Sequence, residues 1–212
     1  MRKYFTNIIF LCFCGLLLGQ TPTSMVTIKG GSYVPLYGVK GENKATKPVN
    51  VKSFQLDIYP VTNAQYKAFL EKHPEWQRSR VKGIFAQKSY LSHWQSDLDF
   101  SPLEAQAPVT HISWFAAKKY CECEGKRLPT TDEWEYVAQA DAQSIDARKK
   151  KHYQEYIVRS MQMPKTYLQK VGSTPKNYWG IYDMHGLVWE WVADFNSVLL
   201  SGDSRKDKQG DD

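Results

Sequence analysis

Apolar residues recur at helical spacing in three parts of the chain, and each part follows a residue suited to cap a helix. Thr62 or Asn63, Ser113 and Thr130 carry side-chain oxygens that can accept a hydrogen bond from the first helical turn. Glu133, three residues after Thr130, completes the pattern of a capping box. We therefore predict three helices, whose inward faces consist of Tyr66, Phe69 and Leu70, of Trp114, Ala117, Tyr120 and Cys121, and of Trp134, Val137 and Ala138.

Alternation of apolar and polar residues predicts short strands near the amino end. Residues 26–28 and 49–56 alternate in this way, and Gly30-Gly31 interrupts the first run. Residues 74–106 have no clean period and are expected to form a long, irregular, aromatic-rich loop region. The Lys-rich residues 141–163 are compatible with a further helix.

A second aromatic-rich run occupies residues 177–194, where two glycines punctuate the sequence. Its pattern predicts a short strand or loop over 179–184 and a turn at His185-Gly186. We expect the apolar residues that follow, from Val188 to Val192 and including Trp189 and Trp191, to form a buried segment.

The first 19 residues have the features of a secretory signal peptide. Arg2 and Lys3 precede an apolar run from Ile8 to Leu18, and the small residue Gly19 follows. The run is too short to span a bilayer as a helix, although a membrane anchor and lipidation at Cys14 stay open as alternatives. We expect a secreted or periplasmic protein without a stable membrane span, with one domain over residues 25–195 and a polar loop or truncated end over residues 196–212.

Charge gives little reason to expect a nucleic-acid partner. The formal net charge is +6, and it falls to +4 without residues 1–19, which contain two basic residues and no acid. The dense basic run 148–151 is better explained as the solvated face of a helix than as a nucleic-acid patch. Aromatic residues make up 14% of the chain, which predicts a core built largely from rings.

The residues offer few candidates for chemistry. Cys121 and Cys123 are the cysteines that remain after the signal peptide, and their side chains diverge on one helix, so neither a disulfide nor a zinc pair is expected. We expect Cys121 in the core and Cys123 exposed. His111 is interpreted as a hydrogen-bonded structural residue, whereas His93 lies in an irregular loop that a ligand can reach.

Several motifs in order resemble those of one family. E-G-K-R-L-P-T-T-D-E-W-E (124–135) and N-Y-W-G-I-Y-D-M-H-G-L-V-W-E-W (177–191) are similar to the signature of the sulfatase-modifying-factor, or formylglycine-generating-enzyme, superfamily. M-V-T-I-K-G-G-S-Y (25–33), Y-P-V-T-N-A-Q-Y-K-A-F-L (59–70) and A-P-V-T-H-I-S-W (107–114) resemble its upstream segments. The resemblance implies an α+β, C-type-lectin-like fold with little regular secondary structure, here lacking its C-terminal part.

The same resemblance implies one metal site. In the family, the turn ahead of V-W-E-W can hold calcium through backbone carbonyls and the Glu side chain, and the matching positions are His185, Gly186, Val188 and Glu190. Leu187 replaces the usual Asn of the family motif. The alternative is that Glu190 pairs with a buried Arg or with backbone amides, because a buried carboxylate without a partner is costly.

Other departures from the family bear on catalysis. The family's oxidases convert a substrate cysteine to formylglycine with copper, which a pair of thiolates binds, and they carry that pair in a C-terminal part that has no counterpart here. Copper is therefore not expected in this chain. Two hypotheses follow: a secreted, non-catalytic module that binds an envelope protein or peptide, or a copper- or iron-dependent oxidase whose catalytic part is missing from this chain.

Overall fold

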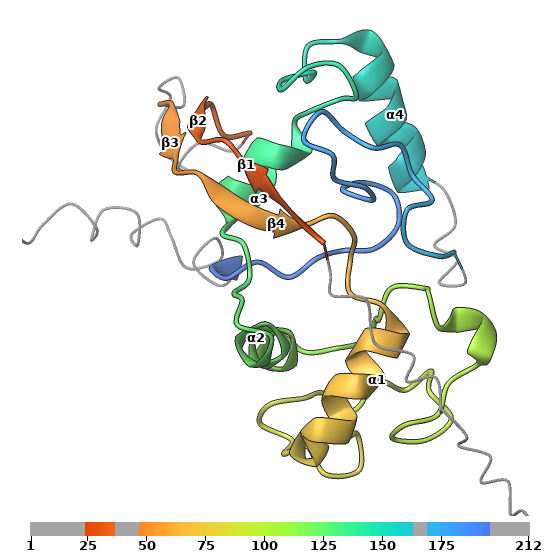
Figure 1. Cartoon of the computed structure of the whole chain (residues 1–212). Helices are drawn as coiled ribbons and strands as arrows, with labels where there is room; N and C mark the ends of the chain where they lie inside the picture. Colours follow the sequence, from red (N-terminus) through yellow and green to blue (C-terminus); the bar gives the residue numbers. More distant parts are fainter. Residues whose placement is uncertain (1–23, 37–46, 163–168, 196–212) are drawn as a thin grey trace, which may run out of the picture.

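The computed structural model describes residues 24–36, 47–162 and 169–195 (Figure 1). Helices and short strands are mixed, and long irregular segments connect them, so the α+β prediction with little regular structure is confirmed. The predicted signal peptide (1–19) and the predicted polar end (196–212) lie outside the described residues. Within the described ranges, no helix is both long and apolar enough to cross a membrane.

Four short strands form two antiparallel pairs. Strand β1 (Met25–Ile28) pairs with β4 (Phe54–Asp57), and β2 (Gly31–Tyr33) pairs with β3 (Val49–Val51). The single strand predicted over 49–56 is therefore wrong, because the chain bends between β3 and β4. Gly30, which lies between β1 and β2, packs against this bend. A Cβ atom there would come within 2.5 Å of the Val51 carbonyl oxygen, so the close approach requires glycine.

Helix α1 (Asn63–Lys72) begins as the sequence predicts. The Thr62 hydroxyl accepts a hydrogen bond from the Gln65 amide at 3.3 Å, and the Gln65 side chain accepts one from the Thr62 amide at 2.9 Å. The reciprocal pair is a capping box, and it fixes the start of the helix. The three predicted inward residues of α1 are all buried: Tyr66, Phe69 and Leu70.

Helices α2 (Trp114–Cys123) and α3 (Thr131–Ala138) also follow their predicted caps. The Ser113 hydroxyl accepts from the third residue of α2 at 3.1 Å, and Gly125 adopts φ 68°, the left-handed conformation expected after the helix. At α3, Glu133 accepts from the Thr130 amide at 2.8 Å and completes a capping box. The Arg127 guanidinium holds the same carboxylate with two hydrogen bonds of 2.6 and 2.7 Å.

Helix α4 (Lys151–Gln162) is shorter than the segment predicted from residue 141. The Asp141 carboxylate accepts hydrogen bonds from the backbone amides of Gln143 and Ser144, at 2.9 and 2.6 Å, and this local turn competes with a helix. Two 3-10 helices, η1 (Pro74–Trp76) and η2 (Pro102–Glu104), interrupt the loop region after α1.

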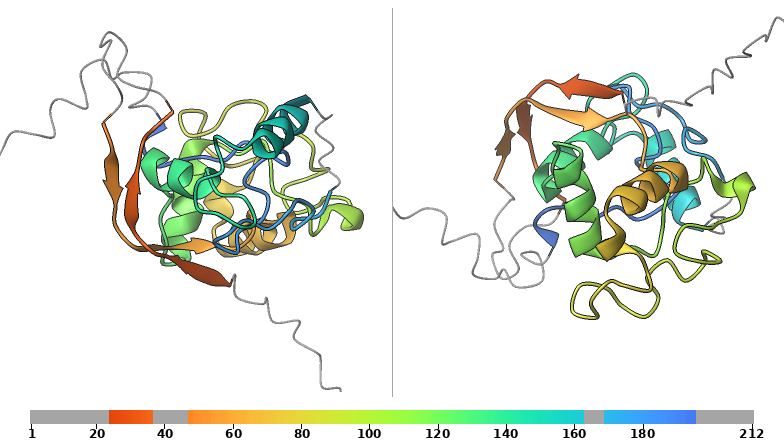
Figure 2. Two further views of the ribbon diagram at one scale, coloured as in Figure 1. Left: turned by 90° about the horizontal axis from the view of Figure 1, so that it is seen from above. Right: turned by 60° about the horizontal axis from the view of Figure 1, so that its bottom comes forward.

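The buried side chains form two clusters. Figure 2 shows the strands along one side of the molecule, with the helices beside them. The first cluster joins α1 and α2 to the loop region and contains Tyr66, Phe69, Leu70, Tyr90, Leu91, Trp94, Val109, Ala116 and Tyr120. The second joins the strands to α3 and the 181–184 segment and contains Ile28, Tyr33, Val51, Tyr136, Val137, Ala138, Ile181 and Met184.

The capping box of α3 gives a direct stability prediction. We expect Thr130→Ala to lower the free energy of unfolding by about 1 kcal/mol, because the substitution leaves the Glu133 amide without its hydroxyl acceptor. Thr130→Ser keeps that oxygen and serves as the matched control. Urea denaturation followed by circular dichroism measures the difference; equal midpoints for the Ala and Ser variants would show that the cap contributes nothing.

Candidate functional site

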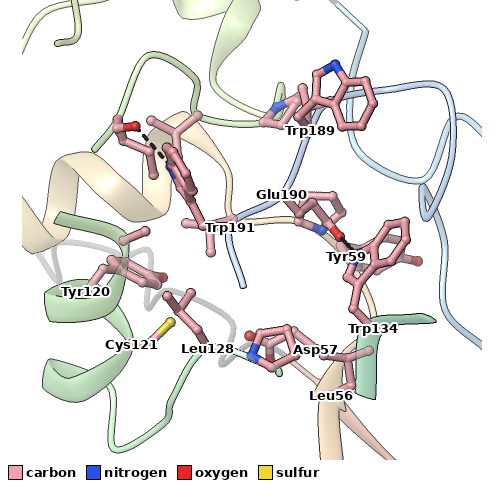
Figure 3. A pocket seen from close by; sticks show the side chains of 18 of the residues that line it. Leu56, Asp57, Tyr59, Tyr120, Cys121, Leu128, Trp134, Trp189, Glu190 and Trp191 are labelled. Atoms are coloured by element: carbon pink, nitrogen blue, oxygen red, sulfur yellow. Dashed lines mark hydrogen bonds between the residues drawn. The ribbon is translucent and has the colours of Figure 1, made fainter. Parts of the chain in front are cut away.

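The main candidate site is an open pocket of about 610 Å³ between strand β4, helices α2 and α3 and the segment after the His185-Gly186 turn (Figure 3). Most of its wall is apolar and aromatic. The labelled side chains in Figure 3 come from all four parts of the wall and are Leu56, Asp57, Tyr59, Tyr120, Cys121, Leu128, Trp134, Trp189, Glu190 and Trp191. A cavity of this size, lined by rings and a few polar groups, is typical of a ligand site.

An ion pair closes one side of the pocket. Lys126 Nζ donates to both carboxylate oxygens of Asp57, at 2.7 and 2.9 Å, and both side chains are largely buried. The pair connects the end of β4 with the turn after α2. The two partners are 69 positions apart in the sequence, and sequence reasoning did not single out Asp57. Charge on this side of the pocket is therefore balanced within the protein.

Glu190 is a second acidic residue of the pocket wall. Its carboxylate accepts a hydrogen bond of 2.7 Å from the Trp134 indole N–H (Figure 3). The surrounding protein raises the pKa of Glu190 to about 7, because desolvation disfavours the carboxylate, and the negative charge of Asp183 acts in the same direction. The residue is nevertheless open to the pocket. A ligand in the pocket would therefore meet the Glu190 carboxyl group.

The segment from Val188 to Val192 is less buried than predicted. Trp189 is 87% exposed and Trp191 is 37% exposed, so the expectation of a buried segment is wrong for both rings. The segment pairs with no strand and is held by side-chain donors: the Trp114 indole N–H donates to the Val192 carbonyl at 2.9 Å. Trp191 likewise donates to the Ile112 carbonyl at 3.0 Å.

The residues predicted to hold calcium lie close together, but two of them have protein partners. The His185 carbonyl accepts a hydrogen bond from the Tyr156 hydroxyl at 3.3 Å, and the Glu190 carboxylate is bonded to Trp134 as described. Gly186 adopts φ 93°, which favours glycine at the turn. Calcium requires six to eight oxygen ligands, and the described residues contain no group of three or more His, Cys, Asp or Glu side chains placed for a metal. Calcium binding at His185, Gly186, Val188 and Glu190 stays a prediction.

The two cysteines of the described residues do not converge. Both are free, and both are half-buried against the first core cluster, so the prediction of an exposed Cys123 is wrong. Cys121 lines the pocket, and burial together with the negative charge of Asp57 raises the pKa of its thiol to about 11. At neutral pH this thiol is almost entirely protonated, which makes it a poor nucleophile and a poor metal ligand.

Asp183 is a buried acid, next in sequence to pocket-lining residues, that sequence reasoning missed. It is 1% exposed, has a φ of 62°, and its carboxylate accepts hydrogen bonds from the backbone amides of Gly172 and Thr174. The Thr174 hydroxyl in turn accepts from the Asp183 amide at 2.8 Å. An acid within the aromatic run 177–194 was the available signal, since a buried acid needs such partners. Asp183 joins the loop at 172–174 to the segment that leads into the pocket.

The sequence of this chain is similar to those of several known proteins. The chain is 32% identical over 177 residues to the serine/threonine-protein kinase pkn1 of Chlamydia caviae; the match covers 82% of this chain and 28% of the relative. It is 30% identical over 217 residues to the inactive C-alpha-formylglycine-generating enzyme 2 of Bos taurus; the match covers 82% of this chain and 71% of that protein. It is 28% identical over 232 residues to the formylglycine-generating enzyme of Mus musculus; the match covers 87% of this chain and 62% of that protein.

These relatives differ in length from this chain and in the activities that their names give. The chain spans little more than a quarter of the kinase relative. A family model described as the sulfatase-modifying factor enzyme 1-like domain matches residues 18–211. The chain therefore belongs to the sulfatase-modifying factor enzyme 1-like family.

Proposed function

We propose that this chain is a non-catalytic binding module of the cell envelope, and that the pocket bounded by β4, α2 and α3 is its binding site. The observation that carries the proposal is the combination of an open, ring-lined pocket with thiols unsuited to copper chemistry. Cys121 and Cys123 are about 200° apart around the axis of α2, so they cannot converge on one ion without unwinding the helix. A bovine relative whose name calls it inactive supports a non-catalytic role.

The expected partner is an envelope protein or a peptide. Exposed Trp189 at the pocket mouth and the rings of the wall supply large, rigid contact surfaces of the kind enriched in protein interfaces. The proposed location follows from the signal-peptide pattern of residues 1–19. We further propose that the α+β fold is of the C-type-lectin-like kind, which the family resemblance implies.

The alternative is an oxidase of the formylglycine-generating type, dependent on copper or iron, whose catalytic groups lie outside this chain. The similarity to the formylglycine-generating enzyme of Mus musculus favours it, and the chain covers 62% of that protein. The two functions differ in whether the chain itself turns over a cysteine substrate.

We expect no conversion of cysteine to formylglycine by this chain. The purified chain is incubated with copper, oxygen, a reductant and a cysteine-containing peptide with a sulfatase motif, and the peptide is weighed by mass spectrometry. The thiol mass should persist, because the half-buried Cys121 stays protonated and diverges from Cys123. The mouse enzyme serves as positive control. An aldehyde product that disappears in Cys121→Ser or Cys123→Ser would contradict the proposal.

Binding at the pocket mouth is tested by photo-crosslinking in the native cell. A photoreactive amino acid at Trp189, which is 87% exposed, should crosslink to an envelope protein or peptide, whereas the same group at Leu103, which is 89% exposed and not part of the pocket, should not. The crosslinked chain should begin near Gln20 on N-terminal sequencing. Equal crosslinking from both positions would refute binding at the pocket. An intact Met1 on cytoplasmic protein would refute export.

Calcium at His185, Gly186, Val188 and Glu190 is proposed from the family motif, and it has its own test. Saturating calcium should raise the melting temperature of the chain, since a ligand at 100 times its dissociation constant stabilises the folded state by about 2.7 kcal/mol. Glu190→Gln should abolish the shift while still accepting the Trp134 hydrogen bond. Glu155→Gln, on the surface of α4, is the control. An equal shift in the Glu190 variant would exclude this carboxylate as a ligand.

A further inference from the structure

An exposed apolar surface lies outside the pocket, where the loop region after α1 meets α2. Ile84 is 77% exposed, and the neighbouring Phe85 is also exposed. Phe115, in the first turn of α2, is 45% exposed, and its ring centre lies 5.5 Å from that of Phe85. None of the three side chains lines the pocket. Ile84, Phe85 and Phe115 together make up this surface, the tip patch.

The loop that carries most of the tip patch is fastened at its base. The Arg78 guanidinium donates to the carbonyls of Leu91 and Trp94, each at 2.9 Å. The Ser79 amide donates to the Asp97 carboxylate at 2.9 Å. Leu91 and Trp94 themselves are buried in the first core cluster. The exposure of the patch therefore belongs to a loop whose two ends are fixed.

A turn at the end of this loop directs the patch outward. The Phe85 amide donates to the Lys82 carbonyl at 2.8 Å. At Gly83, inside the turn, an added Cβ atom would have no heavy atom within 4 Å, so that side of the turn is open. Figure 1 shows the loop region beside α1, at the end of the molecule away from the strands and α4. An extended surface can therefore reach the turn without first meeting those elements.

The loop carries positive charge around the tip. Residues 76–96 contain no Asp or Glu and four basic residues, which are Arg78, Arg80, Lys82 and Lys88. Lys82 and Lys88 are exposed and flank the apolar pair Ile84 and Phe85 in the sequence. The ion pairs among the described residues include neither lysine. These two ammonium groups are therefore available to an anionic surface.

The neighbouring acids do not cancel this charge. Asp97 lies at the base of the loop, where hydrogen bonds from Ser79 and the charges of Arg78 and Arg80 lower its pKa. On α2, the Glu122 carboxylate lies 4.0 Å from the ammonium group of a lysine of the same helix, and this pair is about half exposed. Such surface pairs contribute little. Neither acid forms an ion pair with the two lysines of the tip.

We propose that the tip patch binds the surface of an anionic phospholipid membrane, a function beyond the pocket binding proposed above. Apolar side chains flanked by Lys are typical of segments that lie in a membrane interface. Ile84 and the two rings enter the headgroup region, while Lys82 and Lys88 stay at the level of the lipid phosphates. Contact of this kind needs no spanning helix, and the described residues contain none.

The size of the patch favours a membrane over a protein partner. A specific protein interface buries about 800 Å² on each side. Burying a large aromatic side chain contributes at most about 250 Å², so three side chains that are already partly covered supply less than the area required. A membrane contact combines the insertion of a few side chains with attraction between charges, and the patch with its lysines offers both.

Sedimentation with phospholipid vesicles tests the proposal on the protein in the form that its native cell produces. We expect binding to phosphatidylcholine vesicles that contain phosphatidylglycerol, and weaker binding at high salt because salt screens the lysines. Vesicles of phosphatidylcholine alone should bind little protein. Ile84→Ser and the double variant Lys82→Gln/Lys88→Gln should each lower the affinity for anionic vesicles about tenfold.

Two controls match these variants. Leu103→Ser removes a side chain that is even more exposed but lies outside the patch. Lys149→Gln/Lys151→Gln makes the same change of charge at the start of α4. Both controls should bind nearly as the wild type does. Equal affinity of the patch variants and the controls, or no binding of the wild type to anionic vesicles, would overturn the proposal.

Hydrogen exchange of the wild-type protein does not depend on the folding of a variant. Anionic vesicles should slow the exchange of amides in residues 82–88 and leave α4 unchanged; unchanged exchange in residues 82–88 of vesicle-bound protein would contradict the proposal. A photoreactive group at Ile84 that crosslinks in the native cell to a protein and to no lipid would assign the patch to a protein partner instead. Neither result bears on crosslinking at Trp189, so the two proposals can fail separately.

Discussion

Three tryptophan N–H groups hold the last described segment of the chain in place. Trp114 and Trp191 connect this segment to the region around α2 through backbone carbonyls, and Trp134 of α3 reaches the Glu190 carboxylate. The Ala193 amide also donates to the Pro129 carbonyl at 2.7 Å, and the Thr131 amide and hydroxyl donate to the Asp194 carboxylate at 2.7 and 2.9 Å. These bonds hold the segment in place, and residues of the segment and of β4 line the same pocket.

Local signals in the sequence were sufficient for the helices. The capping residues Thr62, Ser113 and Thr130 all act within three residues of their own position, so a linear pattern contains the whole interaction. The start of α4 was missed because Asp141 offers the backbone a competing turn. The break between β3 and β4 was missed because the alternation of side chains continues across it.

Long-range contacts account for most of what the sequence did not reveal about the site. Asp57 and Lys126 are far apart along the chain, and nothing local indicates that they pair. The same holds for His93 and His111, whose proximity depends on a backbone bond between two irregular segments. Hydrophobicity predicted burial for Trp189, but burial requires a covering element, and its ring is largely exposed. The family motifs identified the domain, whereas the chemistry of the pocket became visible only in the structure.

The division of the interior into two clusters has a consequence for cooperativity. Tyr66 and Tyr120 belong to the first cluster, Ile181 and Met184 belong to the second, and all four line the pocket. A molecule in the pocket would therefore contact both clusters at once. Regions of a protein can open with different free energies, and a ligand that bridges two of them makes their opening interdependent. Occupancy of the pocket would thus determine whether the two halves of the domain unfold separately or as one unit.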